Sequence, residues 1–208
     1  MICLLQPVVY VIDDDPDCLR TLISIVESMR LNATACVDAA QFLSCYAEDR
    51  PSCLVTDLRM RGMSGLDLLR YLKEQNYPIP AIIVTGYSDT ETAVAAMHAG
   101  AVTYLEKTGS DQKLCDAISQ ALELSTKWLE DKKVVERVKQ IWMSLNAEER
   151  QTLQMVAQGK LNKEIAFKTG DSLRTVEDRR RRLMAKTEAN SIVDLIRFAL
   201  RIEELGLS

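Results

Sequence analysis

Short, continuously apolar runs alternate with longer amphipathic stretches in the first half of the chain, and this alternation constrains the fold most. Five runs are expected to be strands, at residues 8–12, 33–37, 53–56, 81–85 and 102–105. Helical periodicity marks residues 16–30, 39–48, 65–75 and 89–99, and a further helix begins at Asp111. Strands that are apolar throughout are typical of a parallel sheet covered on both faces. The alternation therefore predicts a doubly wound α/β domain.

The pattern changes after Asp111, because no Gly or Pro occurs between Asp111 and Leu145. Apolar residues recur there at nearly helical spacing, which predicts one long helix over 111–145 or two helices joined by a small break. Asn146 and Glu149 have the spacing of a capping box that begins a new helix. Four helices are expected, at about 147–158, 161–168, 173–186 and 191–204. The second half is therefore predicted to be a small all-α domain.

The two halves of the chain differ in charge. Residues 1–125 contain 9 basic and 17 acidic side chains, whereas residues 126–208 contain 17 basic and 13 acidic ones. The basic half includes four consecutive arginines, at 179–182. This division predicts two modules with different partners and favours a polyanion for the second. A solvated helix face is the alternative interpretation of the arginine run.

The apolar segments and the cysteines indicate which cellular compartment to expect. No stretch approaches the ~18 apolar residues of a membrane helix, and the first apolar residues run directly into acidic ones. We therefore expect a cytoplasmic protein with no membrane partner. The six cysteines form no CxxC pair, and His98 is the single histidine. Neither a disulfide framework nor a Cys/His zinc site is expected.

Carboxylates follow two of the expected strands. Asp13, Asp14 and Asp15 come after the first strand, and Asp57 follows the third. Because the functional crevice of an open parallel sheet lies beyond the carboxyl ends of its strands, we expect Asp13, Asp14 and Asp57 to meet there. Carboxylates this close repel one another unless a cation neutralises them. An oxygen-only set of ligands suits Mg²⁺.

Two further polar residues end strands at the same edge. Thr85 closes the fourth strand and Lys107 follows the fifth. Each has an ordinary structural explanation when taken alone. Carboxylates, a hydroxyl and an ammonium that converge on one point suit phosphoryl transfer, in which positioning and charge neutralisation do most of the catalysis.

Residues 7–123 resemble the receiver domain of two-component response regulators of the FixJ/NarL type, in the stretches VIDDDPD, LVTDLRMRGMSGLDLL, AIIVTGYSD and AVTYLEK. The resemblance implies a flavodoxin-like, five-stranded parallel sheet in the order 2-1-3-4-5. It implies that Asp57 is the phosphoacceptor and that a partner sensor histidine kinase supplies the phosphoryl group. The implied Mg²⁺ ligands are Asp13, Asp14, Asp57 and the backbone carbonyl of Arg59. The implied phosphoryl-binding and switch residues are Thr85, Tyr104 and Lys107, whereas Asp15 is expected to cap a helix.

Four positions modify this expectation. Arg61 and Thr108 stand where the receiver family usually has Pro. A cis bond before Thr108 would cost about 3–4 kcal/mol, so we predict a trans Lys107–Thr108 bond, with Gly109 absorbing the altered chain path. Lys107 is then expected to be less firmly fixed before phosphorylation. Arg59 and Tyr87, two residues after Asp57 and Thr85, are bulky and predict slow autodephosphorylation.

The basic half contains the stretches NAEERQTLQMVAQGKLNKEIA, SLRTVEDRRRRLMAK and SIVDLIRFALR. On these stretches, residues 147–203 resemble the helix-turn-helix output domain of the LuxR type. Ser172 is expected to cap the recognition helix, with Val176, Leu183 and Met184 facing the domain core. The expected DNA-binding residues are Lys163, Arg174, Thr175, Glu177, Asp178, Arg181 and Arg182. Arg181 is the best candidate to read a base, because a bidentate arginine–guanine contact is the commonest specific one. Alternatively, the arginines neutralise the acids through i,i+4 pairs, Glu177–Arg181 and Asp178–Arg182.

These observations predict a DNA-binding transcriptional response regulator that is not itself an enzyme. The expected parts are a receiver at 1–123, a helical linker at 124–145 and a helix-turn-helix domain at 146–208. Phosphorylation of Asp57 is expected to favour a homodimer on a two-fold operator, and the apolar stripe of 111–145 pairs between protomers or packs on its own domains. Two alternatives remain. One is a receiver whose helical half binds protein. The other is an aspartyl-phosphate phosphohydrolase, although those enzymes typically have a second Asp where this chain has Arg59.

Overall fold

The five apolar runs form one parallel sheet in the computed structural model, which describes residues 6–86 and 89–207. The strands are β1 (Val8–Ile12), β2 (Asn32–Cys36), β3 (Ser52–Asp57), β4 (Ala81–Thr85) and β5 (Ala101–Glu106). Their spatial order is β2-β1-β3-β4-β5, which confirms the predicted topology. Val9 of β1 pairs with Ala33 of β2 on one side and with Cys53 of β3 on the other. All five strands therefore end at the same edge of the sheet.

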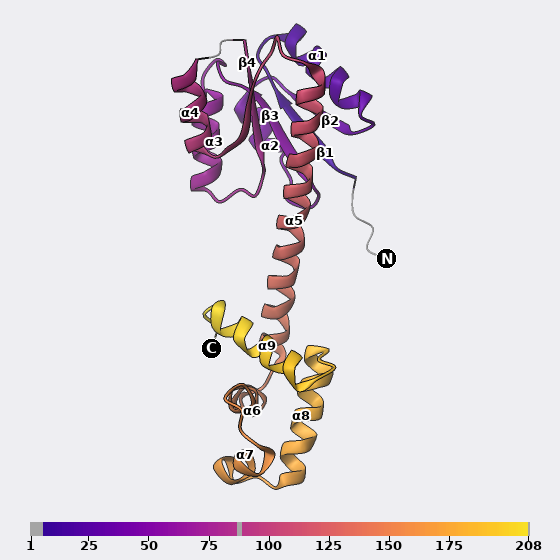
Figure 1. Ribbon diagram of the computed structural model, residues 1–208, viewed down its shortest axis with the longest axis vertical. Coiled ribbons are helices and arrows are strands. Elements are labelled where there is room, and N and C mark those ends of the chain that lie inside the picture. Colours follow the sequence, from indigo (N-terminus) through magenta and orange to yellow (C-terminus); the bar gives the residue numbers. More distant parts are fainter. Residues whose placement is uncertain (1–5, 87–88, 208) are drawn as a thin grey trace. The chain divides into compact units, whose positions relative to one another are not determined.

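Helices cover both faces of this sheet (Figure 1). Helices α1 (Pro16–Ser28) and α5 (Asp111–Ser144) pack on one face, and α2 (Ala39–Cys45), α3 (Gly65–Glu74) and α4 (Thr90–Ala99) pack on the other. Because successive strand residues point to opposite faces, Val9 and Val11 join the core beneath α1 and α5. Tyr10 and Ile12 join the core beneath α2, α3 and α4. Both faces of the sheet are buried, which explains why the strand sequences do not alternate between apolar and polar residues.

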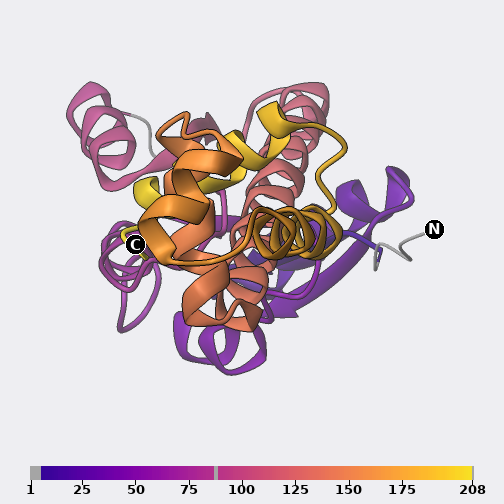
Figure 2. The ribbon, with the colours of Figure 1, turned by 90° about the horizontal axis from the view of Figure 1, so that it is seen from below.

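Four helices form a second unit, within the division of the chain into Met1–Glu130 and Asp131–Ser208. They are α6 (Ala147–Ala157), α7 (Asn162–Thr169), α8 (Leu173–Thr187) and α9 (Ile192–Glu204). Helix α6 packs against both α8 and α9, and α7 packs against α8. Figure 2 looks nearly along the axis of α8. The buried centre of this unit includes Leu153, Ile165, Leu183 and Leu195, so each of the four helices contributes to one core.

Helix α5 is a single helix without the break that the sequence left open. Leu114 and Ile118, near the start of α5, belong to the core between α1, α5 and the sheet. Trp142, near its end, and Leu145, directly after it, belong to the core of the helical unit. Its apolar stripe is thus used for packing within the units at both ends. The boundary between the units falls inside this helix, and the domain limits at 123/124 and 145/146 stay predictions. Among the described residues, no helix combines the length and apolar character needed to cross a bilayer.

Candidate phosphoacceptor site and nucleic-acid interface

Three carboxylates meet at the carboxyl edge of the sheet. Asp13 and Asp14 directly follow β1, and Asp57 is the last residue of β3. One oxygen from each of the three lies within 4.8 Å of the others. Asp13 and Asp57 are buried, and the side chain of Asp14 remains 30% exposed. The cluster is therefore open to solvent on the side of Asp14.

Asp15 is not part of this cluster, because its carboxylate caps α1. It accepts hydrogen bonds from the backbone amides of Asp17, at 2.8 Å, and Cys18, at 3.3 Å. These bonds lower the pKa of Asp15. The prediction that Asp15 is a capping residue is confirmed.

Lys107 is held between two of the carboxylates. Its Nζ lies 2.6 Å from Oδ2 of Asp13 and 3.2 Å from Oδ1 of Asp57. Burial alone would lower the pKa of Lys107, but the pairing with Asp13 and Asp57 outweighs burial and raises it. Burial raises the pKa of Asp57, and Lys107 acts in the opposite direction. The expectation that Lys107 is loosely fixed before phosphorylation is therefore wrong, because two buried acids attract the ammonium whatever residue follows it.

The connection between β5 and α5 follows the predicted chain path. The Lys107–Thr108 peptide bond is trans. The amide of Gly109 donates to the carbonyl of Glu106 at 2.9 Å and closes a tight turn. A Cβ atom on Gly109 would lie 2.9 Å from that carbonyl oxygen, so the turn has little room for a side chain. Helix α5 then begins at Asp111, as expected.

Thr85 and Tyr104 lie on neighbouring strands and the same face of the sheet. Thr85 is buried at the end of β4, and its carbonyl accepts the amide of Lys107 at 2.8 Å. Tyr104 is half-buried, and in the strand register it lies opposite Ile83, two residues before Thr85. The side chains of Ile83 and Tyr104 both belong to the core beneath α2, α3 and α4. The structure therefore places the expected switch residues beside one another along the β4–β5 pair.

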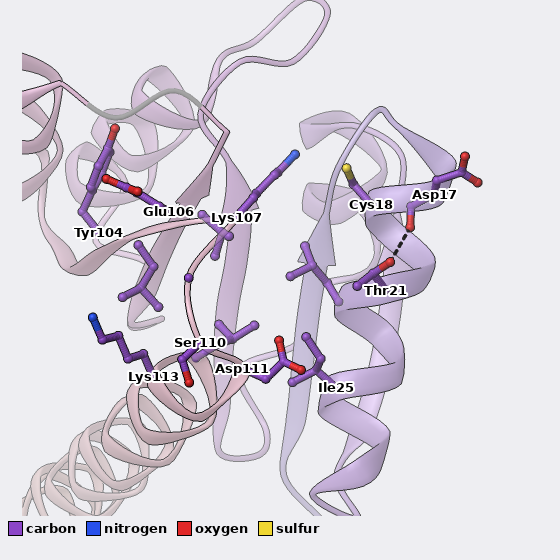
Figure 3. Close-up of a pocket in the computed structure, with 15 residues that line it drawn as sticks. Asp17, Cys18, Thr21, Ile25, Tyr104, Glu106, Lys107, Ser110, Asp111 and Lys113 are labelled. Carbon is purple, nitrogen blue, oxygen red and sulfur yellow. Dashed lines mark hydrogen bonds between the residues drawn. The ribbon is translucent and has the colours of Figure 1, made fainter.

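A cavity of about 540 Å³ lies beside the acid cluster, between α1 and α5 (Figure 3). Lys107 and Cys18 lie at one end of it, and Ser110 and Asp111 lie at the other. Lys107 thus borders both the cavity and the cluster.

Two residues at the cluster were not assigned from the sequence. The first residue of α3, Gly65, approaches the backbone of Asp57 so closely that a Cβ atom would lie 2.2 Å from the Asp57 carbonyl oxygen. Arg61 was noted only as a departure from the family, yet its backbone amide donates to Oδ2 of Asp14 at 3.3 Å. Its guanidinium Nε lies 3.8 Å from the same oxygen. No local sequence signal links Arg61 to a residue 47 positions earlier.

The donor set of the cluster fits a magnesium ion. Asp13, Asp14 and Asp57 offer only carboxylate oxygens, which are the ligands that Mg²⁺ prefers. Arg59 is exposed, and its backbone amide donates to Oδ2 of Asp57 at 3.2 Å. Tyr87, the other residue expected to shield this site from water, lies outside the described residues.

The helical unit contains a helix-turn-helix formed by α7 and α8. Ser172 caps α8 by accepting the amide of Thr175 at 3.1 Å, and Val176 and Leu183 are buried, as predicted. Met184 is partly buried against the same core. The expected DNA-binding residues at 163, 174, 177, 181 and 182 are exposed, whereas Thr175 and Asp178 are half-buried. The exposed set lies on α7 and α8, whose outer surfaces enter or flank the groove in this motif.

The four consecutive arginines do not act as one charged face. Arg179 is buried and donates to Asp171 and Glu148, both at 2.7 Å. Arg180 donates to the side chain of Asn162 on α7. Arg181 pairs with Asp178 at 3.0 Å, which replaces the predicted i,i+4 pairing of Glu177 with Arg181 by an i,i+3 pair. Arg179 and Arg180, two of the four arginines, therefore make hydrogen bonds within the helical unit.

An α/β unit with an acid cluster and a lysine at its carboxyl edge, followed by a helix-turn-helix, defines a receiver joined to a DNA-binding module. Two family models match the corresponding residues. The response regulator receiver domain matches residues 9–119, and the luxR family of bacterial regulatory proteins matches residues 143–199. The chain belongs to the response regulator family and is a transcriptional regulator with a LuxR-type DNA-binding domain.

Similar proteins share this organisation over nearly their whole length. Nodulation protein W of Bradyrhizobium diazoefficiens is 37% identical over 203 residues, covering 98% of this chain and 88% of that protein. Transcriptional regulatory protein FixJ of the same species is 36% identical, covering 93% of this chain and 94% of that protein. The solved structure of response regulator StyR has a TM-score of 0.88 at 32% identity, covering 95% of this chain and all of that one. These relatives favour the transcriptional interpretation over the phosphohydrolase and protein-binding alternatives.

Proposed function

We propose that Asp57 accepts a phosphoryl group from a sensor histidine kinase and that this phosphorylation controls DNA binding by the helical unit. The observation that carries the proposal is the convergence of Asp13, Asp14 and Asp57 around the Lys107 ammonium. In the transfer, an Asp57 carboxylate oxygen attacks phosphorus, a new P–O bond forms, and the P–N bond to the kinase histidine breaks. In this proposal the chain receives the phosphoryl group and acts as a regulator.

Residues around Asp57 position and neutralise the phosphoryl group. Asp13, Asp14, Asp57 and the carbonyl of Arg59 would hold Mg²⁺, which supplies positive charge against the phosphoryl oxygens. Lys107 already lies within ion-pair distance of Asp57 and supplies a second positive charge. Thr85 provides a hydroxyl to a phosphoryl oxygen, and Tyr104 moves with Thr85 as the two-state element that phosphorylation biases.

The output proposal follows from the exposed residues of α7 and α8. Arg181 reads a base edge, and Lys163, Arg174 and Arg182 contact phosphates. Thr175 belongs to the same DNA-binding set. Glu177 and Asp178 border the same surface, where an acid can accept from cytosine N4. Phosphorylation favours a homodimer, and two copies of the recognition helix then bind a two-fold operator. The receiver at 1–123, the linker at 124–145 and the domain at 146–208 are the parts of this mechanism.

The test of the phosphoacceptor is intact mass after incubation with acetyl phosphate. We expect the full chain to gain one phosphoryl group with Mg²⁺ present and none with excess chelator. The Asp57→Asn variant should gain none, because an amide does not replace the carboxylate nucleophile. Equal gain of mass by Asp57→Asn at the same rate would refute the assignment.

A further inference from the structure

Two cysteines that the phosphoacceptor site does not use lie next to each other in the first unit. Cys36 is the last residue of β2, and Cys45 is the last residue of α2. Their Sγ atoms are 3.8 Å apart, although the residues are nine positions apart in the sequence. Cys36 is fully buried in the core beneath α2, α3 and α4, whereas Cys45 is exposed. One residue of the pair is therefore accessible to solvent and the other is not.

We propose that Cys36 and Cys45 form an oxidative modification site, at which a hydroperoxide converts the two thiols into a reversible disulfide. An S–S bond is about 2.05 Å long, so the sulfurs must approach by about 1.8 Å. Cys45 occupies the terminal position of the seven-residue helix α2, and the next residue, Tyr46, already has extended backbone. The present contact of Cys45 is a weak thiol hydrogen bond to the carbonyl of Phe42 at 3.4 Å. Little is lost when this sulfur turns toward Cys36.

The different environments of the two thiols assign their roles. Cys45 reacts first, because it is the exposed residue of the pair and Cys36 is closed off from a dissolved peroxide by burial. Cys36 is fully buried and is therefore shielded from dissolved peroxide until its partner is oxidised. It then resolves the intermediate, because the two sulfurs are already in contact.

The two steps balance in atoms and electrons. The Cys45 thiolate attacks one oxygen of the hydroperoxide, an S–O bond forms, and the O–O bond breaks. This gives a sulfenic acid on Cys45 and, from hydrogen peroxide, water. The Cys36 sulfur then attacks the Cys45 sulfur, an S–S bond forms, and the S–O bond breaks. The departing hydroxide takes the Cys36 proton and leaves as a second water. The two sulfurs lose two electrons in total, and the peroxide gains them.

The modification site is one hydrogen bond away from the acid cluster, although the proposal does not depend on the function of that cluster. The backbone amide of Asp13 donates to the carbonyl of Cys36 at 3.3 Å. A disulfide would join the end of α2 covalently to the end of β2, whose Cys36 carbonyl accepts this amide. The exposed helix end would then be linked, through Cys36 and this hydrogen bond, to the backbone of the buried Asp13.

The experiment uses the full chain treated with a small molar excess of hydrogen peroxide at low protein concentration. We expect intact mass to fall by two hydrogen atoms and to return after treatment with a phosphine reductant. Digestion before aspartates separates Cys45, in residues 38–48, from Cys36, in residues 17–37. Without reduction, these two peptides should be joined, and fragmentation should assign the link to Cys36 rather than Cys18.

Single variants decide between this site and general thiol oxidation. Cys45→Ser changes an exposed side chain and should abolish the loss of two hydrogens. Cys36→Ala keeps an apolar residue in the core and should accumulate a Cys45 sulfenic acid that dimedone traps. Cys115→Ser removes a half-buried cysteine on α5 and should form the disulfide as the unmodified chain does. A linked pair that excludes either Cys36 or Cys45, or oxidation of Cys45 without a link, would overturn the proposal.

Discussion

The backbone amide of Arg61 donates to the carboxylate of Asp14, 47 positions earlier in the chain, at 3.3 Å. A proline at position 61 would have no amide hydrogen to donate. The guanidinium of Arg61 also lies 3.8 Å from the same oxygen of Asp14, although the arginine side chain is 97% exposed. Arg61 therefore contributes both a hydrogen bond and a nearby positive charge to a residue expected to bind Mg²⁺.

Replacing Arg61 with Ala should strengthen Mg²⁺ binding. The guanidinium competes with the cation for the Asp14 oxygen, and an exposed ion pair contributes about 0.2–1 kcal/mol. We expect Mg²⁺ to bind Arg61→Ala up to about fivefold more tightly, measured by isothermal titration calorimetry. Arg61→Pro removes the amide as well, so the difference between the two variants measures the hydrogen bond. Arg50→Ala, at an exposed arginine paired with Asp49, is the control, and the same increase there would contradict the prediction.

The phosphorylated form should lose its phosphoryl group slowly. Water must approach phosphorus in line with the bond to Asp57. Arg59, whose bulky side chain is exposed, lies only two residues further along the chain. A smaller amide at 59 and an acid at 87 should admit and position water. The double variant Arg59→Asn, Tyr87→Glu is therefore expected to shorten the half-life several-fold, followed by intact mass after removal of the donor. An unchanged half-life would mean that these side chains do not shield the site.

Two neighbouring arginines should affect DNA binding differently. Arg181→Ala should reduce the ratio of affinities for operator and random DNA, because a bidentate base contact is lost. Arg182→Ala should weaken binding to both kinds of DNA equally and reduce the dependence on log salt concentration by about 0.9 per lost phosphate contact. Fluorescence anisotropy at several salt concentrations measures both effects. Equal losses on both DNAs for Arg181→Ala would assign that arginine to a phosphate.

Arg179 should matter for stability instead. Its buried guanidinium makes two charge-assisted hydrogen bonds, to Asp171 and Glu148. We expect Arg179→Ala to lower the free energy of unfolding of the helical unit by about 2–4 kcal/mol. Urea unfolding followed by circular dichroism checks this value. Arg181→Ala, on the same helix but exposed, should change it by less than about 0.5 kcal/mol. Similar losses for the two variants would contradict a structural role for Arg179.

The stability of the helical unit should also depend on pH through Glu149. Burial would raise the pKa of Glu149, but hydrogen bonds from Lys186, at 2.7 Å, and from the Asn146 amide outweigh burial and lower it. A lowered pKa in the folded state means that Glu149 stabilises the unit above its ordinary pKa of 4.5 and that this contribution disappears as the carboxylate is protonated at lower pH.

The corresponding measurement compares Glu149→Gln with the unmodified chain from pH 7 to pH 3. Near neutral pH the variant should be less stable by about 1–3 kcal/mol, because it loses the charge that pairs with Lys186. Urea midpoints for the two proteins should converge below pH 4.5. A constant difference across this range would show that packing, not ionisation, accounts for the effect.

Local patterns predicted the sheet and most of the acid cluster correctly for a physical reason. Strands buried on both faces must be continuously apolar, and parallel strands bring the residues that follow them to one edge. Asp13, Asp14 and Asp57 could therefore be placed together from strand order alone. Helix ends were less predictable: α2 stops at Cys45 because Tyr46 adopts extended backbone, which the helical periodicity of 39–48 does not indicate.

The errors concern side chains whose partners are distant in the sequence. The arginine run suggested one charged surface, but Arg179 is buried against Glu148, 31 positions away. Lys107 was expected to be loose because the following loop differs from the family pattern, yet its position depends on Asp13 and Asp57. Arg61 had no local signal for its contact with Asp14. Such pairs depend on the tertiary fold, which composition and periodicity do not specify residue by residue.

Both tryptophans of the chain lie on α5, one in each compact unit. Trp128 is 37% exposed, whereas Trp142 is buried with the guanidinium of Arg150 4.7 Å from its ring centre. Each unit therefore contains one tryptophan, which can be excited selectively over tyrosine, and Trp128→Phe or Trp142→Phe leaves a reporter for the other unit. Comparing the emission of the two single-tryptophan proteins across a urea gradient separates the unfolding midpoints of the units. The gap between those midpoints measures, without any label, how far cooperativity extends along one continuous helix.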